Sequence, residues 1–294
     1  GSVTVRATGV GGAGGDGGAS GGIGGDGANV SLTDLVSGFT TGALRLEQFA
    51  TGGRGGHANS GTTGVAGTGS TSLTYVDTDA SSLFGVSWGT GGQGGTASSA
   101  DGGDGAMGTT HIDITGKAGV TVQAEATGGW GGDSSGAGHR AGDGATATGT
   151  GRGVSTLGGT VNVMLRAEGG IGGSGSIGGN GADVTLADAV SGMTSGNMTL
   201  SQTALGGRGQ TGSAGAGGSH GSAVSTMVFD QTGHSSLTIN ATATAGGTLD
   251  FNSSGTTLAG SAGTAHSSID ATSSGSITLR AISNGGIGGN IAGI

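Results

Sequence analysis

The stretch that decides the fold is Gly9–Gly27, which reads GVGGAGGDGGASGGIGGDG. An extended helix with three residues per turn needs glycine at every third position when one face lies against another backbone, because only a hydrogen atom fits there. Every third residue of this stretch is glycine, and the residues between are mixed. We therefore predict a left-handed polyglycine-type helix that packs backbone to backbone. Its structural positions are Gly9, Gly12, Gly15, Gly18, Gly21, Gly24 and Gly27.

A flexible glycine linker is the alternative interpretation of such a stretch. A linker needs no phase, whereas the phase recurs farther along the chain, most clearly at Gly169, Gly172, Gly175, Gly178 and Gly181. Collagen has the same glycine period, but this chain contains no proline. The prediction implies that valine at Gly12, Gly15 and Gly172 destroys the order of the assembly.

The composition limits both structure and function. Glycine accounts for 78 of the 294 residues, and the charged fraction of 9% is lower than disordered segments usually carry. The net charge is −9, basic residues are scattered and aromatic residues make up 3%, which argues against nucleic-acid binding. No apolar run approaches the roughly 20 residues of a membrane span. The absence of cysteine excludes a disulfide framework and a cysteine-based metal site within this sequence.

Gly-Gly-x-Gly-Gly motifs, or close variants, divide the chain into repeats. Neighbouring centres lie 37 to 41 residues apart, a period of about 39 that is typical of solenoids. The copy at Thr248 keeps only its leading glycine pair. We predict one array of about seven units over residues 1–294. The motif centres are Ala13, Arg54, Gln93, Trp130, Ile171, Arg208, Thr248 and Ile287.

Alternating apolar and polar residues precede nearly every glycine pair and predict half-buried β-strands, whose inward side chains become smaller toward the glycines. These segments begin at Val3, Leu44, Val120, Val161, Met198 and Ile277. Second strands are predicted after the glycine stretches, from Asn29, Thr71, Thr110, Asp183 and Ser225. Polar turn formers near the middle of each glycine stretch would fold it into two antiparallel legs. The fold class is therefore an all-β solenoid without α-helix, and the similarity between the segments from Asn29 and Asp183 indicates that repeats were copied in groups.

The sequence ends at GGIGGNIAGI, just inside an eighth repeat. Solenoid ends normally carry a polar capping unit, and this one has none. We therefore expect a fragment of a longer fibre, or a subunit whose ends are covered by neighbours.

The units SSLTINATATAGG (Ser235–Gly247) and GSITLRAISNGG (Gly275–Gly286) resemble the passenger repeats of bacterial filamentous haemagglutinins and autotransporter adhesins. Those are secreted, rod-like β-solenoids, so the resemblance implies a structural or adhesive role outside the cell or on the bacterial surface. The glycine stretches depart from that family. They are similar to the glycine tracts of mycobacterial PGRS proteins and to the polyglycine bundles of some phage fibre tips and insect antifreeze proteins.

The sequence offers little convergent chemistry. Gly-x-Gly-x-x-Gly, as in Gly9–Gly14, lacks the βαβ context of a dinucleotide site. Gly-x-Ser-x-Gly occurs around Ser20 and Ser134, but a nucleophile elbow needs a strand-to-helix turn and a positioned histidine. The histidines lack metal-pair spacing and are expected on the surface. They are His57, His111, His139, His220, His234 and His266. We expect no catalytic or cofactor-binding residues.

Four residues are candidates for calcium binding, because each precedes Gly-Ala where a glycine stretch ends: Asp26, Asp104, Asp143 and Asn180. The segment GGNGADVTL from Gly178 resembles one calcium-binding RTX nonapeptide. RTX sites need tandem nonapeptides, whereas this motif recurs about every 39 residues. The alternative is that Asp-Gly and Asn-Gly act as turn signals.

The expected function is a structural and adhesive component of a bacterial extracellular filament or surface rod, without catalysis, that self-associates end to end or laterally. The alternative is a β-solenoid module that binds a cell-surface glycan or ice, for which Thr238, Thr242 and Thr244 provide a hint. An enzyme acting on polysaccharides ranks last, because the carboxylates are dispersed along the sequence.

Overall fold

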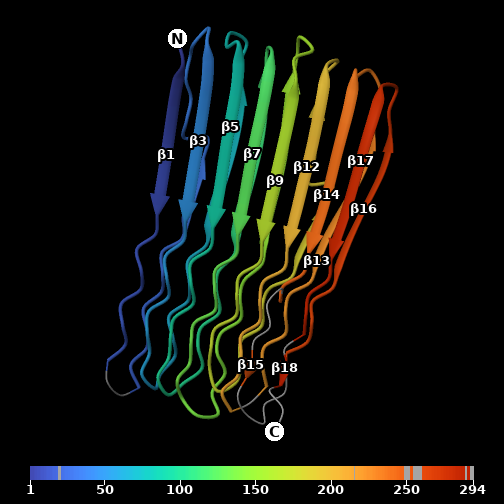
Figure 1. Ribbon diagram of the computed structural model, residues 1–294. Coiled ribbons are helices and arrows are strands. Elements are labelled where there is room, and N and C mark those ends of the chain that lie inside the picture. Colours follow the sequence, from blue (N-terminus) through green and yellow to red (C-terminus); the bar gives the residue numbers. More distant parts are fainter. Residues whose placement is uncertain (19–20, 215, 248–251, 254–259, 289, 292–294) are drawn as a thin grey trace.

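The computed structural model describes residues 1–18, 21–214, 216–247, 252–253, 260–288 and 290–291. These residues form an all-β parallel solenoid of about seven turns, each of about 39 residues, and they include no helix. Each turn descends through a strand and one glycine leg, then returns through a second leg and a second strand (Figure 1). The predicted fold class is confirmed.

One layer is an eight-stranded parallel sheet, called here the front sheet, in the order β1-β3-β5-β7-β9-β12-β14-β17. Its strands stand side by side in the upper half of Figure 1. The bounds are β1 (Val3–Val10), β3 (Ala43–Thr51), β5 (Ser82–Thr90), β7 (Gly119–Thr127), β9 (Val161–Glu168), β12 (Asn197–Leu205), β14 (Ser236–Thr244) and β17 (Ser276–Asn284).

The opposite layer consists of two shorter sheets, called here the back sheets, in the orders β11-β8-β6-β4-β2 and β10-β13-β16. The first contains β2 (Val30–Thr33), β4 (Gly69–Val76), β6 (Gly108–Gly116), β8 (Ala147–Ser155) and β11 (Val190–Met193). The second contains β10 (Val184–Ala187), β13 (Ala223–Asp230) and β16 (Ala265–Thr272). A separate pair is formed by β15 (Asn252–Ser253) and β18 (Asn290–Ile291).

The strand register reproduces the spacing of the glycine motifs. Val3 pairs with Leu44, Leu44 with Leu83, and Leu83 with Val120, which are shifts of 41, 39 and 37 residues. The next two shifts are 41 and 37. These five values equal the first five motif spacings, so the distance between motifs is the length of a turn. Thr248, the centre of the degenerate motif, lies outside the described residues.

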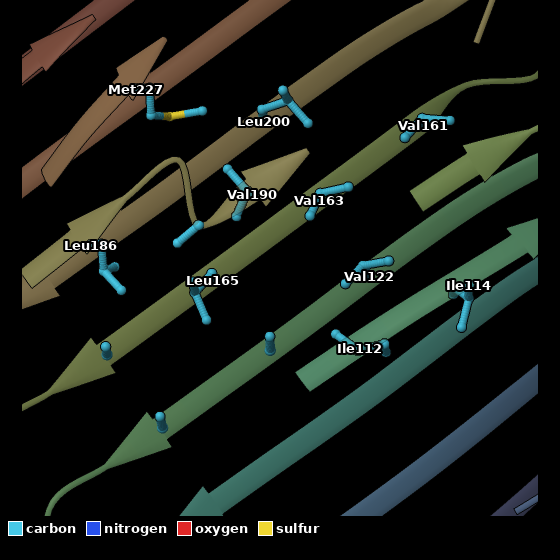
Figure 2. Packing of buried hydrophobic residues seen from close by; sticks show 14 of the residues in the cluster. Ile112, Ile114, Val122, Val161, Val163, Leu165, Leu186, Val190, Leu200 and Met227 are labelled. Atoms are coloured by element: carbon cyan, nitrogen blue, oxygen red, sulfur yellow. The ribbon is translucent and has the colours of Figure 1, made fainter. Parts of the chain in front are cut away.

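The hydrophobic core lies between the two layers, in the strand half of each turn. Figure 2 shows Val163 and Leu165 of β9 gathered with Leu186 of β10 and Val190 of β11, and all four are buried. Full burial of such a side chain contributes about 1.5–3 kcal/mol. Along β9 the last inward residue is Ala167, which is also buried. The core thins toward the glycine legs, as predicted.

The predicted segments leave out several strands, among them β5, β8, β11 and β16. In β5 and β8 the reason is that glycine interrupts the apolar pattern. In β8 the inward places include Gly151 and Gly153. A β-carbon at either glycine would lie 3.1 Å from a methyl group of Val163 in the front sheet. Small residues in one layer thus make room for large residues in the other, which a pattern read along one strand does not reveal.

The same turn, stabilised by a buried glutamine, occurs at the ends of β2 and β10. Asp34 and Asp188 have positive φ angles of 50° and 48°, and the chain turns there. The N–H of the next residue donates to the side chain of Gln48 in one case and of Gln202 in the other, and both glutamines are fully buried. The two sites lie 154 residues apart, which agrees with copying of repeats in groups.

Candidate functional site

The glycine half of the solenoid is a lattice of backbone hydrogen bonds. In the second turn, Gly52 N–H donates to Thr90 O of the next turn at 2.9 Å, and Gly53 N–H donates to Ala28 O of the preceding turn at 2.8 Å. Gly67, on the returning leg, donates to Gly53 O at 2.8 Å. Both legs are thereby bonded to each other and to the neighbouring turns. Each such bond contributes a net of about 1 kcal/mol.

Two of every three residues in a leg face another backbone, and the third faces outward. A β-carbon at Gly52 would lie 1.9 Å from Gly67 O, and one at Gly53 would lie 2.1 Å from Gly12 O. Real β-carbons essentially never approach so closely. The outward place holds Arg54 in this turn. The descending leg of this turn therefore follows the pattern Gly-Gly-x rather than one glycine per triplet, whereas in the returning legs alanine takes some inward places, as at Ala66 and Ala141.

The predicted structural glycines behave differently in the fifth turn and the first. In the fifth turn, a β-carbon at any of them would lie 2.0 to 3.0 Å from a backbone oxygen. In the first turn, Gly24 and Gly27 meet backbone oxygens at 2.4 and 2.2 Å, and Gly9 meets a methyl group of Val30 at 2.7 Å. The fifth-turn glycines are Gly169, Gly172, Gly175, Gly178 and Gly181.

Four glycines of the first turn, Gly12, Gly15, Gly18 and Gly21, face open space, since a β-carbon there would meet nothing within 4 Å. Gly21 has a φ of +65°, which itself favours glycine. The backbone packing expected at Gly12 and Gly15 is therefore not formed within the described part of this chain. Gly11 and Gly14 instead face the returning leg of the first turn.

Aspartate and asparagine side chains complete the lattice at the outward places. Asp104 accepts the N–H of Asp143 at 2.7 Å, Asp143 accepts that of Asn180 at 2.7 Å, and Asn180 accepts that of Ser219 at 2.9 Å. Asp26 likewise accepts the N–H of Val65 at 2.9 Å. All four calcium candidates thus receive a backbone N–H from the next turn. Among the described residues no group of three or more His, Asp or Glu side chains could hold a metal ion.

The serines of the two Gly-x-Ser-x-Gly matches have different outcomes. Ser20 lies outside the described residues. Ser134 is buried, and its hydroxyl donates to Ala100 O at 2.7 Å. Its N–H donates to Ser174 O of the next turn at 2.9 Å, so it is part of the leg rather than of a strand-to-helix elbow.

The expectation that all histidines lie on the surface is wrong for His220 and His234, which are buried. His220 takes the place that Gly181 holds one turn earlier, and its Nδ1 accepts the N–H of Gly209 at 3.1 Å. Burial, and secondarily the charge of Arg208, lower the pKa of His220 below the usual value for histidine. The folded chain therefore favours the neutral form of the imidazole more than the unfolded chain does.

The lowered pKa of His220 predicts acid sensitivity. Below a pH of about 6.5 the unfolded chain takes up a proton that the folded chain resists, so stability is complete above that pH and declines as the pH falls. We expect the melting temperature to drop more between pH 7.5 and 5.5 for the wild type than for His220→Gln. The exposed His266 gives the control, His266→Gln, which should keep the wild-type pH dependence. Equal drops in all three proteins would contradict the prediction.

The outer face of the front sheet carries a charged and aromatic cluster that no local sequence motif indicates. Glu47 is buried and is contacted by the guanidinium groups of Arg6 and Arg45. Burial opposes ionisation of Glu47, but hydrogen bonds and charge attraction from the two arginines outweigh it, so its pKa is lowered. Arg6 also lies over the ring of Phe49, at 4.9 Å from the centroid. The Phe49 ring meets Trp88 edge to face at 5.0 Å.

Thr238, Thr242 and Thr244 lie on the outer face of the same sheet. Thr238 pairs in register with Thr199 and Thr278, and Thr242 pairs with Thr203. Only the row of Thr238 crosses β12, β14 and β17, and Thr244 pairs with Leu205 and Asn284 instead of threonine.

Comparison with protein-family models, with curated proteins and with solved structures finds no match. Among the described residues no helix is long and apolar enough to cross a membrane.

Proposed function

We propose that this chain is a structural and adhesive segment of a bacterial extracellular filament or surface rod, without catalysis, and that copies lengthen the rod by stacking turn on turn. The observation that carries the proposal is a column of glycines. At this place in each later turn, a β-carbon would lie 1.9 to 2.1 Å from the carbonyl oxygen of the glycine one turn earlier. The column contains Gly12, Gly53, Gly92, Gly129, Gly170, Gly207, Gly246 and Gly286.

Gly12 begins this column, and a β-carbon there would meet no atom of the described residues within 4 Å. Glycine is costly to order in an extended segment, so it is retained where another backbone must approach. A carbonyl from a preceding turn would supply that approach at Gly12, as Gly12 itself does at Gly53. Gly15 stands in the same relation to Gly56.

The opposite end offers a matching surface. Ile277 and Leu279 of β17 continue the inward rows of Leu237 and Ile239, which are fully buried in β14. Ile277 and Leu279 are 41% and 44% exposed. If β1 of a second copy paired with β17, it would cover Ile277 and Leu279. The pairing would be parallel, like that of β1 with β3 within the chain. Such a head-to-tail contact does not close on itself and generates a filament.

Stacking predicts filaments that lengthen with protein concentration. Sedimentation velocity should show assemblies that grow with concentration. Electron microscopy should show rods with an axial spacing of about 4.8 Å per turn. Higher ionic strength should favour them, because each copy carries a net charge of −9. A compact monomer at high concentration, without filaments at either low or high salt, would contradict the proposal.

Substitution of the uncovered glycines separates stacking from folding. Gly12→Val/Gly15→Val should fold with an unchanged melting temperature but form no filaments, because its β-branched side chains occupy the stacking face. The matched control is Ala13→Val, whose side chain points outward and should leave assembly intact. Filaments of normal length in the double variant would refute stacking through this face.

A further inference from the structure

Each of the two tryptophans of this chain lies in a shallow hollow on the front face, by which we mean the outer surface of the front sheet and of the descending glycine legs. The first hollow, of about 290 Å³, is formed by Trp88 with Gln123, Glu125, Met164 and Arg166. The second, of about 300 Å³, is formed on the descending legs by Trp130 with Gln93, Asp133, Arg208 and Gln210. Both contain one tryptophan, at least one glutamine, one carboxylate and one arginine.

The tryptophans are presented to solvent rather than packed away. Trp88 is 41% exposed and Trp130 is 55% exposed. Trp88 is held from one side by the edge-to-face contact with Phe49. A ring that is fixed yet uncovered can accept a flat apolar partner at little cost in conformational entropy.

The polar side chains around each ring are held in place. In the first hollow, Arg166 Nη1 donates to Glu125 Oε1 at 2.8 Å, and the same guanidinium also contacts Glu168. In the second, Asp133 accepts the N–H of Ser174 at 2.7 Å. A few positioned polar groups beside an apolar surface are what a small-molecule site uses to fix orientation.

From this repeated composition we infer that the front face binds a neutral oligosaccharide chain, with one sugar ring stacked on Trp88 and another on Trp130. A pyranose has an apolar face of C–H groups and an edge of hydroxyl groups. The face fits the indole ring, and the hydroxyls fit the amide, carboxylate and guanidinium groups beside it. Each hollow has one positive and one negative side chain, and the whole chain carries −9, so an uncharged glycan is favoured over an acidic one.

The spacing of the hollows suits an extended ligand. Trp88 pairs in register with Glu125, and Trp130 lies five residues farther along that same path, about 16 Å away. A glycan running along the strand direction would reach both. A protein partner would need a larger apolar centre with several anchors, whereas each hollow offers one aromatic ring among polar groups. The inference does not depend on stacking, since both hollows lie on the side of the solenoid and not at its ends.

The test uses the two tryptophans as reporters. Cellohexaose and the hexamer of N-acetylglucosamine are titrated into the wild type, Trp88→Phe and Trp130→Phe, so that each variant reports one hollow by fluorescence. Saturable changes from both hollows with one shared Kd are expected, for at least one sugar. No change from either hollow with both sugars at millimolar concentration would overturn the inference.

Substitutions then assign the binding energy, with calorimetry as the readout. Trp88→Ala and Trp130→Ala should each weaken binding about tenfold or more, and the double variant should abolish it. Arg166→Ala should weaken binding, whereas Arg152→Ala should not. Arg152 makes the equivalent contact with Asp113 on the back sheet, at 3.0 Å. Circular dichroism checks that each variant is folded, and undiminished binding by the folded double tryptophan variant would refute the site.

Discussion

Gly172→Val is expected to abolish the folded solenoid, with a loss of more than about 4 kcal/mol. A β-carbon at Gly172 would lie 2.0 Å from Gly179 O on the returning leg of the same turn. Neither backbone can withdraw, because both are bonded to the next turn: Gly172 N–H donates to Arg208 O, and Gly179 O accepts the N–H of Gln210. Thermal melting and resistance to proteolysis measure the effect.

The control for this prediction is the neighbouring outward residue. Ile171→Val changes a half-buried side chain at the outward place of the leg, and stability should stay within about 0.5 kcal/mol of the wild type. Gly12→Val should likewise be tolerated by the isolated chain, whereas Gly53→Val in the same column should resemble Gly172→Val. If Gly172→Val melted within a few degrees of the wild type, backbone packing could not be what stabilises the glycine half.

Gln202→Ala is expected to destabilise the chain by about 3 kcal/mol or more. The fully buried side chain accepts the N–H of Ala189 at 3.2 Å and donates to Leu186 O at 3.2 Å and to Thr226 O at 3.0 Å. Its removal leaves buried backbone groups without partners, each at a cost of about 1–3 kcal/mol, and opens a cavity. Urea denaturation with a constant slope measures the loss.

Two further variants sharpen this second prediction. Gln48→Ala should cost a similar amount, since Gln48 accepts the N–H of Leu35 at 2.6 Å and donates to Ser72 O at 2.8 Å. The two effects should add in the double variant, because the sites lie several turns apart. Thr203→Ala, on the outward side of the same strand, should have almost no effect. A loss below about 1 kcal/mol for Gln202→Ala would mean that water replaces the amide at this position.

The sequence was sufficient for the repeat and for most of the strands. Motif spacing predicted the turn lengths because each motif marks the same place in successive turns. Alternation predicted β1, β3, β7, β9, β12 and β17, since their inward residues are large. It failed for β8, where Gly151 and Gly153 take the inward places and the bulk comes from Val163 in the other layer.

The roles of the candidate site residues could be predicted less well from the sequence. Asp104, Asp143 and Asn180 have the residue types of cation ligands, but each uses its side-chain oxygen to accept a backbone N–H one turn away. Nothing in the local motif distinguishes the two uses. The grouping of Trp88 with Arg166, 78 positions later, was likewise invisible, because it depends on two successive turn lengths and on which residues face outward.

The sequence by itself determined that this chain is a repetitive β-structure with about 39 residues per turn and a backbone-packed glycine half, because period and phase are properties of residue order. Only the tertiary structure decided which two glycines of each triplet are buried, which glycines remain uncovered at Gly12 and Gly15, and which outward side chains meet. Those outcomes arise from contacts between residues one turn apart. Their partners are set by how turns stack, and no single segment contains that information.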